Sequence, residues 1–328
     1  MTQQPHEIIW NLTNAVVVSS SIHVVAELGV ADHIGDDPVG VSELASRCGA
    51  DQDALDRVLR LLAAHGVFAG VGGAYEHTEP SRLLRSDHPR SMRAFSRMMR
   101  LPMFTATLGQ LQHSLRTGSP ALEQVAPEGL WPYLQAHPAE AEVFGQAMTA
   151  KAGADIAAVL DAYDFSRFGT IADIGGGRGH LLRGVLDAAP TAEGVLFDLP
   201  EVITTVDLDK ERLTARAGDF FVDPLPSADA YTLMEVIHDW SDAEAAAILR
   251  AIRRAAQPAA VVLIIEGVID EQQPDPRVQT LDVVMLAFTG GRERSPDQLE
   301  KLLDSADLRL NKIIETTGPM SIIEAVIA

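Results

Sequence analysis

The sequence predicts an α/β protein made of a helical N-terminal half and a C-terminal half built on a mainly parallel sheet. Up to about Asp161, apolar residues recur at helical spacing, whereas from about Thr170 short apolar runs alternate with helical segments. Such alternation is typical of a parallel sheet with helices on both faces. It ends in two strands, 308–315 and 321–327, around a Thr317-Gly-Pro turn, which predicts a closing antiparallel hairpin.

Composition and charge exclude several classes of protein. With 328 residues and 47% hydrophobic side chains, the chain can form two domains with substantial cores. Its net charge of −20 disfavours binding to nucleic acid or to an anionic membrane, because the phosphates of either would repel it. Cys48 is the only cysteine, so neither a disulfide within the chain nor a cysteine metal cluster can form, and a reducing cytoplasm fits that count.

The sequence offers no pattern typical of a targeting or membrane signal. No basic stretch precedes an apolar run at the N-terminus, which argues against a signal peptide. The apolar run 261–265 has the length of a buried strand, and we expect no segment to approach the roughly 20 residues that span a bilayer. We therefore expect a soluble, cytoplasmic protein with no membrane or nucleic-acid partner.

The N-terminal half has the pattern of a winged helix. Residues 8–28 carry apolar side chains at helical spacing, and Gly29 stands where a helix C-cap would. Asp51 is the expected N-cap of a helix that ends at Gly66, and a Gly-Gly turn at 72–73 then joins two short strands. Helices followed by a small hairpin predict the winged-helix arrangement.

The charge of this half argues against DNA binding, the usual function of a winged helix. Residues 1–110 contain nine Arg and no Lys against twelve Asp and Glu. One predicted helix brings four arginines near one face, for which a solvated or intersubunit face is the simpler explanation: Arg90, Arg93, Arg97 and Arg100. The long apolar first helix predicts that this half buries surface against a second copy, as a homodimer.

A glycine-rich loop follows the first predicted strand of the C-terminal half, in Asp173-Ile-Gly-Gly-Gly-Arg-Gly. Glycines there let the backbone approach a ligand closely at the carboxyl ends of the strands. The spacing is G-x-G-x-G from Gly175 through Gly177, whereas a dinucleotide-binding fingerprint needs a glycine where this chain has His180. The loop therefore disfavours a nicotinamide cofactor, and a plain tight turn remains the structural alternative.

Acidic residues at later strand ends favour an adenosine ligand. Asp198 stands just past the second strand, where a carboxylate can accept both ribose hydroxyls. Asp219 and Phe220 follow the third strand and supply an acid and a flat ring suited to adenine. Asp198 alone could be a helix N-cap before Pro200, but three acid-bearing strand ends in order are harder to explain as caps.

Five motifs, in order, resemble those of the plant-type (caffeic acid-like) O-methyltransferases and their bacterial relatives in natural-product pathways. They are Asp-Ile-Gly-Gly-Gly, Asp-Leu-Pro, Gly-Asp-Phe-Phe, His-Asp-Trp and Gly-Gly-Arg-Glu-Arg, beginning at residues 173, 198, 218, 238 and 290. The resemblance covers nearly the whole chain. It implies the Rossmann-like seven-stranded sheet of class I methyltransferases, S-adenosylmethionine as cofactor with no metal, and a small-molecule hydroxyl, above all a phenol, as acceptor. It also implies three regions: a winged-helix dimerisation domain (1–110), a helical connector lining the acceptor pocket (111–165) and a cofactor-binding catalytic domain (166–328).

The resemblance implies roles for individual residues as well. His238 falls on the family's general base, and Glu266 and Glu293 fall on the two carboxylates that flank it. The residues expected to bind the cofactor are Asp173, Gly175, Gly177, Asp198, Asp219 and Phe220. Those expected to line the acceptor pocket are Phe144, Met148, Asp239, Met285 and Thr289. Many plant members have a lysine four residues before the histidine, where this chain has Met234, and that departure puts one cofactor contact in doubt.

These residue types suit methyl transfer to a hydroxyl. The sulfonium carries its own leaving group, so the protein must mainly hold the acceptor oxygen in line with the methyl group. A phenol has a pKa of about 10, so a base must remove its proton at neutral pH, and a neutral imidazole is the natural one. Carboxylates beside His238 would orient its ring and stabilise the imidazolium.

Other interpretations of the same residues stay open. Taken singly, His238, Glu266 and Glu293 could be an ordinary helix-start, strand-end and loop residue, and only their joint occurrence in this order favours catalysis. An enzyme on the same scaffold could keep the cofactor and hydroxylate, decarboxylate or catalyse a pericyclic step. A winged-helix regulator without enzymatic activity is the least favoured alternative.

Overall fold

The computed structural model describes residues 4–207 and 211–327 and divides into two compact units. Unit 1 comprises Met1–Thr105 and Ala139–Lys151, and unit 2 comprises Ala106–Pro138 and Ala152–Ala328. Two helices contribute residues to both units: α6 (Pro102–Gly109) and α9 (Pro138–Ala162). The three regions expected from the sequence, with boundaries at residues 110 and 165, stay a prediction.

Unit 1 has the predicted winged-helix arrangement, in which the β2-β3 hairpin follows the helices and β1 completes a small antiparallel sheet of order β1-β3-β2 among the described residues. Its elements are α1 (Pro5–Glu27), η1 (Val30–His33), β1 (Val39–Gly40), α2 (Val41–Cys48), α3 (Gln52–Ala64), β2 (Phe68–Val71), β3 (Ala74–His77), α4 (Glu79–Arg82) and α5 (Arg93–Met98). Asp51 is the N-cap of α3, because its side chain accepts a hydrogen bond from the Ala54 amide at 2.9 Å. Gly72 and Gly73 both have positive φ in the hairpin turn between β2 and β3.

The arginine-rich helix is shorter than predicted and its guanidinium groups are engaged within unit 1. Helix α5 begins only at Arg93, so two of the four arginines lie outside it. Arg93 pairs with Asp32 at 3.1 Å, and Arg97 pairs with Glu27 at the end of α1 at 2.7 Å. These ion pairs join α5 to α1 and η1, and the expectation of a solvated or intersubunit arginine face stays a prediction.

Helix α1 exposes a row of large apolar side chains on the surface of its own unit. These are Ile8, Ile9, Trp10, Leu12, Val16 and Val17, each between 44% and 70% exposed. The helix is long and apolar enough to cross a membrane by length and composition, with a mean hydropathy of 1.4. The expectation that no segment would reach that length was wrong, although one such helix near the N-terminus is weak evidence for a membrane span.

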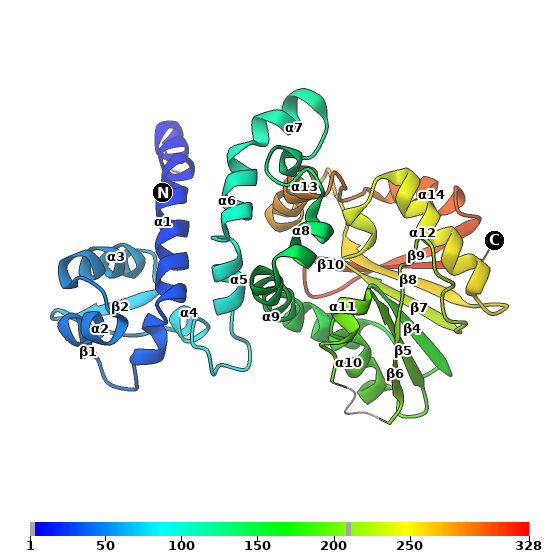
Figure 1. Cartoon of the computed structure of the whole chain (residues 1–328), viewed down its shortest axis with the longest axis horizontal. Coiled ribbons are helices and arrows are strands. Elements are labelled where there is room, and N and C mark those ends of the chain that lie inside the picture. Colours follow the sequence, from blue (N-terminus) through cyan, green and yellow to red (C-terminus); the bar gives the residue numbers. More distant parts are fainter. Residues whose placement is uncertain (1–3, 208–210, 328) are drawn as a thin grey trace. The chain divides into compact units, whose positions relative to one another are not determined.

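Unit 2 is built on a sheet of seven strands over the described residues, in the order β6-β5-β4-β7-β8-β10-β9 (Figure 1). The five strands from β6 to β8 are parallel, and β10 pairs antiparallel with both β8 and β9. The strands are β4 (Thr170–Ile174), β5 (Glu193–Asp198), β6 (Leu213–Ala217), β7 (Ala230–Met234), β8 (Val261–Gly267), β9 (Leu308–Glu315) and β10 (Met320–Ile327). The predicted parallel sheet and closing hairpin are confirmed.

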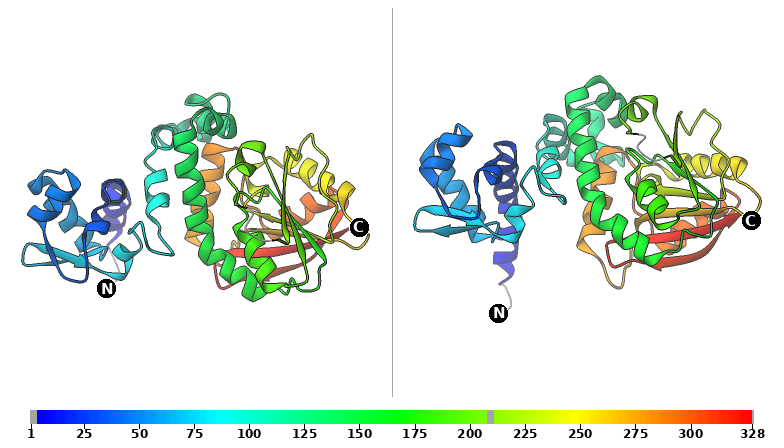
Figure 2. Two further views of the ribbon diagram at one scale, coloured as in Figure 1. Left: turned by 60° about the horizontal axis from the view of Figure 1, so that its bottom comes forward. Right: turned by 90° about the horizontal axis from the view of Figure 1, so that it is seen from below.

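Helices cover both faces of this sheet, and β4, β7 and β8 are accordingly buried along almost their whole length (Figures 1 and 2). They are α10 (His180–Ala188), α11 (Pro200–Ile203), α12 (Asp242–Ala255) and α14 (Pro296–Asp304). Helix α13 (Pro276–Phe288) packs instead against α7 (Leu111–Thr117) and η2 (Ala121–Gln124), and α8 (Leu130–Ala136) follows η2 in the chain. One apolar cluster joins α12 and α14 to the sheet, and another joins α10 and the end of α9 to its opposite face. Neighbouring residues of β4 alternate between the clusters, since Ile171 belongs to one and Ala172 to the other.

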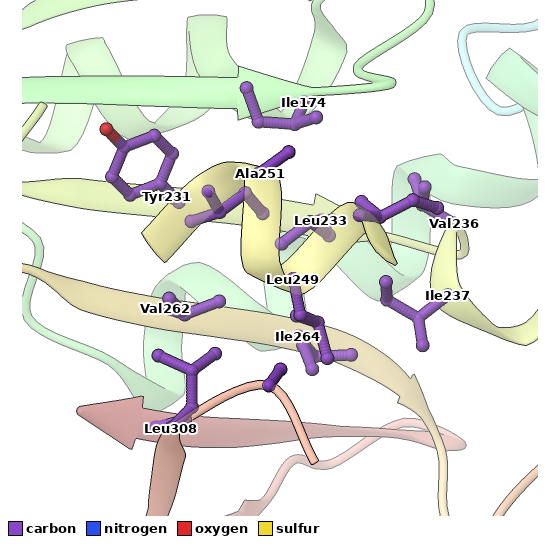
Figure 3. Packing of buried hydrophobic residues seen from close by; sticks show 14 of the residues in the cluster. Ile174, Tyr231, Leu233, Val236, Ile237, Leu249, Ala251, Val262, Ile264 and Leu308 are labelled. Carbon is purple, nitrogen blue, oxygen red and sulfur yellow. The ribbon is translucent and has the colours of Figure 1, made fainter. Parts of the chain in front are cut away.

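The first cluster reaches the carboxyl end of β7, where the chain turns toward the candidate site. Val236 and Ile237 are buried there together with Leu233 and Ile264 of the central strands (Figure 3). Glu235 links β7 to this turn with a φ of 54°, a left-handed conformation that non-glycine residues rarely adopt. Packing of Val236 and Ile237 therefore holds the short helical turn η3 (Ile237–Asp239) against the sheet.

Candidate active site

The glycine loop after β4 adopts a backbone conformation that favours glycine. Gly175, Gly177 and Gly179 have φ values of 66°, 58° and 77°, in the left-handed region that disfavours a side chain. At Gly176 a Cβ would overlap the carboxylate of Asp173 and the side chain of Leu196. The loop thus needs glycine for two reasons, backbone conformation and close packing against the ends of β4 and β5.

Two carboxylates face this loop. Asp198 accepts hydrogen bonds from the amides of Gly177 and Leu199, each at 2.7 Å, while burial raises the pKa of its carboxyl. Asp173 is buried, and its Oδ1 accepts a hydrogen bond from Thr232 at 2.7 Å, while its Oδ2 has no partner. Burial raises the pKa of Asp173 to about 7, against the opposing effect of the Thr232 bond.

These observations fit an adenosine-bearing cofactor with a charged amino acid portion. An unpartnered buried carboxylate oxygen costs free energy unless a ligand donates to it, and Asp173 Oδ2 is such an atom. The glycine loop leaves open space beside Gly177, where a Cβ would meet no atom within 4 Å. We infer that Asp173, Gly175 and Gly177 would hold the amino acid end and Asp198 the ribose.

An aromatic cluster borders the loop on the side of β6. Phe220 lies near Gly175, since a Cβ on that glycine would be 3.8 Å from its ring. The rings of Phe220, Phe221 and Trp240 pack edge to face, with centroids 4.7 to 5.8 Å apart. Asp219 caps the turn between them, because its Oδ1 accepts from the Phe221 amide at 2.8 Å. Trp240 therefore connects Phe220, which is expected to flank adenine, to the segment that carries His238.

His238 lies in η3, buried among carboxylates of η3 itself, of β8 and of the loop after α13. Its Nδ1 is 2.7 Å from Glu293 Oε1, and its backbone amide donates to Glu266 Oε1 at 3.0 Å. The carboxylate of Asp239 lies 4.0 Å from Nε2. Because Glu293 engages Nδ1, Nε2 is the ring nitrogen left to exchange a proton with a ligand.

The surroundings of His238 make it a stronger base than an ordinary histidine. Burial disfavours the imidazolium, but the hydrogen bond to Glu293 and the charges of Asp239 and Glu266 outweigh burial and raise the pKa of His238 to about 10. Burial raises the pKa of Glu266 to about 7, while the positive charge of His238 acts in the opposite direction. His238 and Glu266 thus both hold a proton more tightly than an ordinary histidine or glutamate.

The Gly290-Gly291 loop brings Glu293 to the histidine. A Cβ at Gly291 would overlap the His238 carbonyl oxygen and the backbone of Asp239, so only glycine fits there. The hydroxyl of Thr289, the C-cap residue of α13, accepts from the Gly291 amide at 3.2 Å and orients this loop. Close backbone packing is therefore what sets the distance between Glu293 and the ring.

The residues expected to line an acceptor pocket fall in different units. Asp239, Met285 and Thr289 lie in unit 2, and Met285 is buried on α13. Phe144 and Met148 lie in unit 1, on its portion of α9, where the ring of Phe144 packs at 6.4 Å from Phe104. The acceptor-lining role of all five stays a prediction.

Sequence reasoning assigned no role to three residues that the structure places at this site. Thr232 donates to Asp173, Trp240 packs on the aromatic pair, and Arg294 bonds to the turn that holds His238. Arg294 stands in the Gly-Gly-Arg-Glu-Arg motif, which is the signal that points to it. Among residues 4–207 and 211–327, no cluster of His, Cys, Asp and Glu is arranged to hold a metal ion.

The strand order, the glycine loop and the acidic strand ends together define a class I methyltransferase. Residues 109–309 match the O-methyltransferase domain, and residues 10–87 match the O-methyltransferase dimerisation domain. The chain is 36% identical over 315 residues to the phenazine O-methyltransferase PhzM of Lysobacter antibioticus, with 94% of this chain and 92% of that protein covered. It is 35% identical over 318 residues to the mitomycin biosynthesis 6-O-methyltransferase of Streptomyces lavendulae, with 93% and 89% covered.

A solved structure shows the same fold. CalO1, a methyltransferase of calicheamicin biosynthesis in its S-adenosylhomocysteine-bound form, superposes with a TM-score of 0.88 at 32% identity, and all of both chains is covered. The chain belongs to the O-methyltransferase family with an N-terminal dimerisation domain. It is an S-adenosylmethionine-dependent O-methyltransferase of natural-product biosynthesis that acts on small-molecule acceptors.

Proposed function

We propose that this enzyme methylates a phenolic hydroxyl and that His238 is its general base. The observation that supports the proposal is the buried His238–Glu293 pair, with 2.7 Å between Nδ1 and Oε1, which leaves Nε2 for the acceptor. A nitrogen oriented in this way can accept a proton from a hydroxyl as the oxygen attacks. When bound, S-adenosylmethionine supplies the electrophilic methyl group together with its leaving group.

His238 and the carboxylates around it have different roles in the transfer of this proton. His238 takes the hydroxyl proton at Nε2, and Glu293 stabilises the resulting imidazolium through Nδ1. Glu266 holds the backbone amide of His238, so it fixes the turn more than the ring itself. Asp239 adds negative charge 4.0 Å from Nε2, which also favours the protonated ring.

A raised pKa has two opposite consequences for such a base. With a pKa of about 10, His238 matches a phenol, so proton transfer between them is close to balanced. The neutral ring is, however, a minor form at pH 7, and its fraction rises as the pH approaches 10. We therefore propose that turnover of a weakly acidic phenol increases with pH over this range.

Substitution of the histidine tests the proposal. His238→Ala should lower kcat on a weakly acidic phenol by about 10²- to 10⁴-fold, the usual contribution of a positioned base. The same substitution should affect a nitrophenol much less, since that acceptor is already ionised and needs no base. Titration calorimetry with S-adenosylhomocysteine should show unchanged affinity. Wild-type turnover of the weakly acidic phenol by His238→Ala would rule out the general-base role and favour chemistry other than methylation on the same scaffold.

We further propose that the enzyme is a homodimer formed through unit 1. The apolar row of α1 is exposed within its own unit, and residues 10–87 match a dimerisation domain. Exposed apolar rows of this length are typical of surfaces that another chain covers. Sedimentation of the intact protein should therefore give about twice 35.2 kDa. A cytoplasmic location, expected from the sequence, stays a prediction beside this one.

A further inference from the structure

We propose that Arg294 is a positioning residue whose guanidinium holds the turn of His238 in register with Glu293. This role rests on the proposed function of His238 as the base. Arg294 is only 2% exposed, although arginine is almost never fully buried unless it is paired. A buried guanidinium next to a candidate base therefore needs an explanation beyond surface charge.

The contacts of Arg294 bracket the histidine on both sides. Its guanidinium donates to the carbonyl oxygen of Ile237 at 3.2 Å and to that of Trp240 at 2.9 Å. It also donates through two nitrogens to Asp242 Oδ1, at 3.0 and 2.9 Å. These acceptors lie immediately before His238 and just after it, so one planar group spans the whole turn.

A short turn of this kind needs such external donors. The 3₁₀ segment that contains His238 is three residues long, and segments of that length have poor internal hydrogen-bond geometry. Arginine presents five donors in a fixed fork, whereas lysine is a point charge that cannot reach three separated acceptors in the same way. The geometry of the contacts is therefore specific to arginine.

Arg294 also connects the segment that carries Glu293 to the turn that carries His238. It follows Glu293 directly in the chain, and its backbone carbonyl accepts from the Ile269 amide at 3.0 Å, just beyond β8. The same residue thus anchors the segment that carries Glu293 and binds the turn that carries His238. Displacing one segment against the other would lengthen the bond between Nδ1 and Oε1, which is 2.7 Å.

The test compares Arg294→Lys with wild type on two acceptors. On a weakly acidic phenol kcat should fall by about 10²-fold, the loss that a misplacement of about 1 Å can cause. On a nitrophenol, which needs no base, kcat should stay close to wild type. The Nδ1 proton of His238 should also move upfield in the NMR spectrum, because its hydrogen bond to Glu293 weakens. Arg277→Lys is the matched control, since Arg277 pairs with Asp275 at a helix start on the surface, and it should change neither kcat.

The kcat values on the two acceptors decide whether Arg294 has the positioning role. Equal losses on both acceptors, or no loss on either, would overturn the positioning role. If Arg294→Lys does not fold, Asp242→Ala decides instead, because it removes one anchor of the guanidinium. Its smaller loss should likewise be confined to the weakly acidic phenol, with Asp297→Ala, in the first turn of α14, as control. His238→Ala is measured alongside. Retained turnover in that variant defeats the proposed function, whereas its loss without any effect at Arg294 defeats only the inference.

Discussion

Two regions of this enzyme depart from the usual burial of side chains in opposite directions. Around His238, charged groups are almost fully buried, and each has a partner within unit 2 for at least one of its polar atoms. On α1, large apolar side chains such as Leu12 are exposed within unit 1. In the first region, hydrogen bonds within unit 2 join the buried charged groups, while Oε2 of Glu293 has no partner. The second is exposed among the described residues of unit 1, and we propose that a second copy covers it.

Comparing the two regions separates the residues expected to affect turnover from those expected to affect the dimer. If the base and its carboxylates depend only on contacts within unit 2, changes there should alter turnover and leave the dimer intact. Changes on α1 should do the reverse. The following substitutions test this separation, from the largest expected effect to the smallest.

Gly291→Ala should have the largest effect. The new Cβ would overlap the His238 carbonyl oxygen, so the turn or the Gly290-Gly291 loop must move. A displacement of about 1 Å predicts a loss of about 10²-fold in kcat on a weakly acidic phenol, together with a lower Tm. Gly35→Ala, where a Cβ meets no atom within 4 Å, is the control. Wild-type turnover by Gly291→Ala would mean that the loop is less tightly packed than its geometry implies.

Leu12→Glu should disrupt the dimer and spare the active site. A carboxylate buried without a partner costs several kcal/mol, so the dimer dissociation constant should rise by at least about 10²-fold. Sedimentation at micromolar concentration should then approach 35.2 kDa, while S-adenosylhomocysteine affinity is retained. Val71→Glu, on the hairpin and 50% exposed, should leave the dimer unchanged. A dimer of Leu12→Glu as stable as wild type would place the interface elsewhere.

Glu293→Gln should cost less than loss of the base itself. The amide keeps the shape of the side chain but removes the charge that stabilises the imidazolium. We expect a decrease of about 10-fold in kcat on a weakly acidic phenol, a fraction of the full 10²- to 10⁴-fold. Glu266→Gln should cost less still, since Glu266 bonds to the backbone amide and not to the ring. A loss larger than that of His238→Ala would instead make the carboxylate the primary base.

The smallest expected effect is on stability against pH. The pKa of folded His238 is about 10 against an ordinary value of 6.5, so the folded protein binds the extra proton between these limits. The stabilisation that the folded protein gains from protonation of His238 is therefore complete below pH 6.5, and it is lost as the pH rises toward 10. Between pH 7 and pH 9.5 the Tm of wild type should fall by a few degrees more than the Tm of His238→Gln. Parallel curves for the two proteins would contradict the raised pKa.

Local patterns in the sequence predicted much of the fold. The strand expected at 171–174 is β4, and Asp51 caps α3 as expected, because periodicity and capping act within a few residues. The expected G-x-G-x-G loop lies between β4 and α10, where Gly175 and Gly177 have positive φ. Interpretations that depended on surroundings failed or stayed open. The ion pair of Arg93 with Asp32 was not predicted, because the two residues are 61 positions apart in the chain.

The sequence alone determined the order of the elements, the cofactor class and the kinds of residue available for catalysis. Only the tertiary structure determined which of these residues contact one another. Glu293 reaches His238 across 55 residues of chain, and Arg294 reaches the carbonyl of Ile237 across 57. The raised pKa of His238 depends on several segments at once, since carboxylates on η3, on β8 and on the loop after α13 outweigh the effect of burial. Propensities act over a few neighbouring residues, whereas desolvation and hydrogen-bond distances depend on the packing of the whole unit.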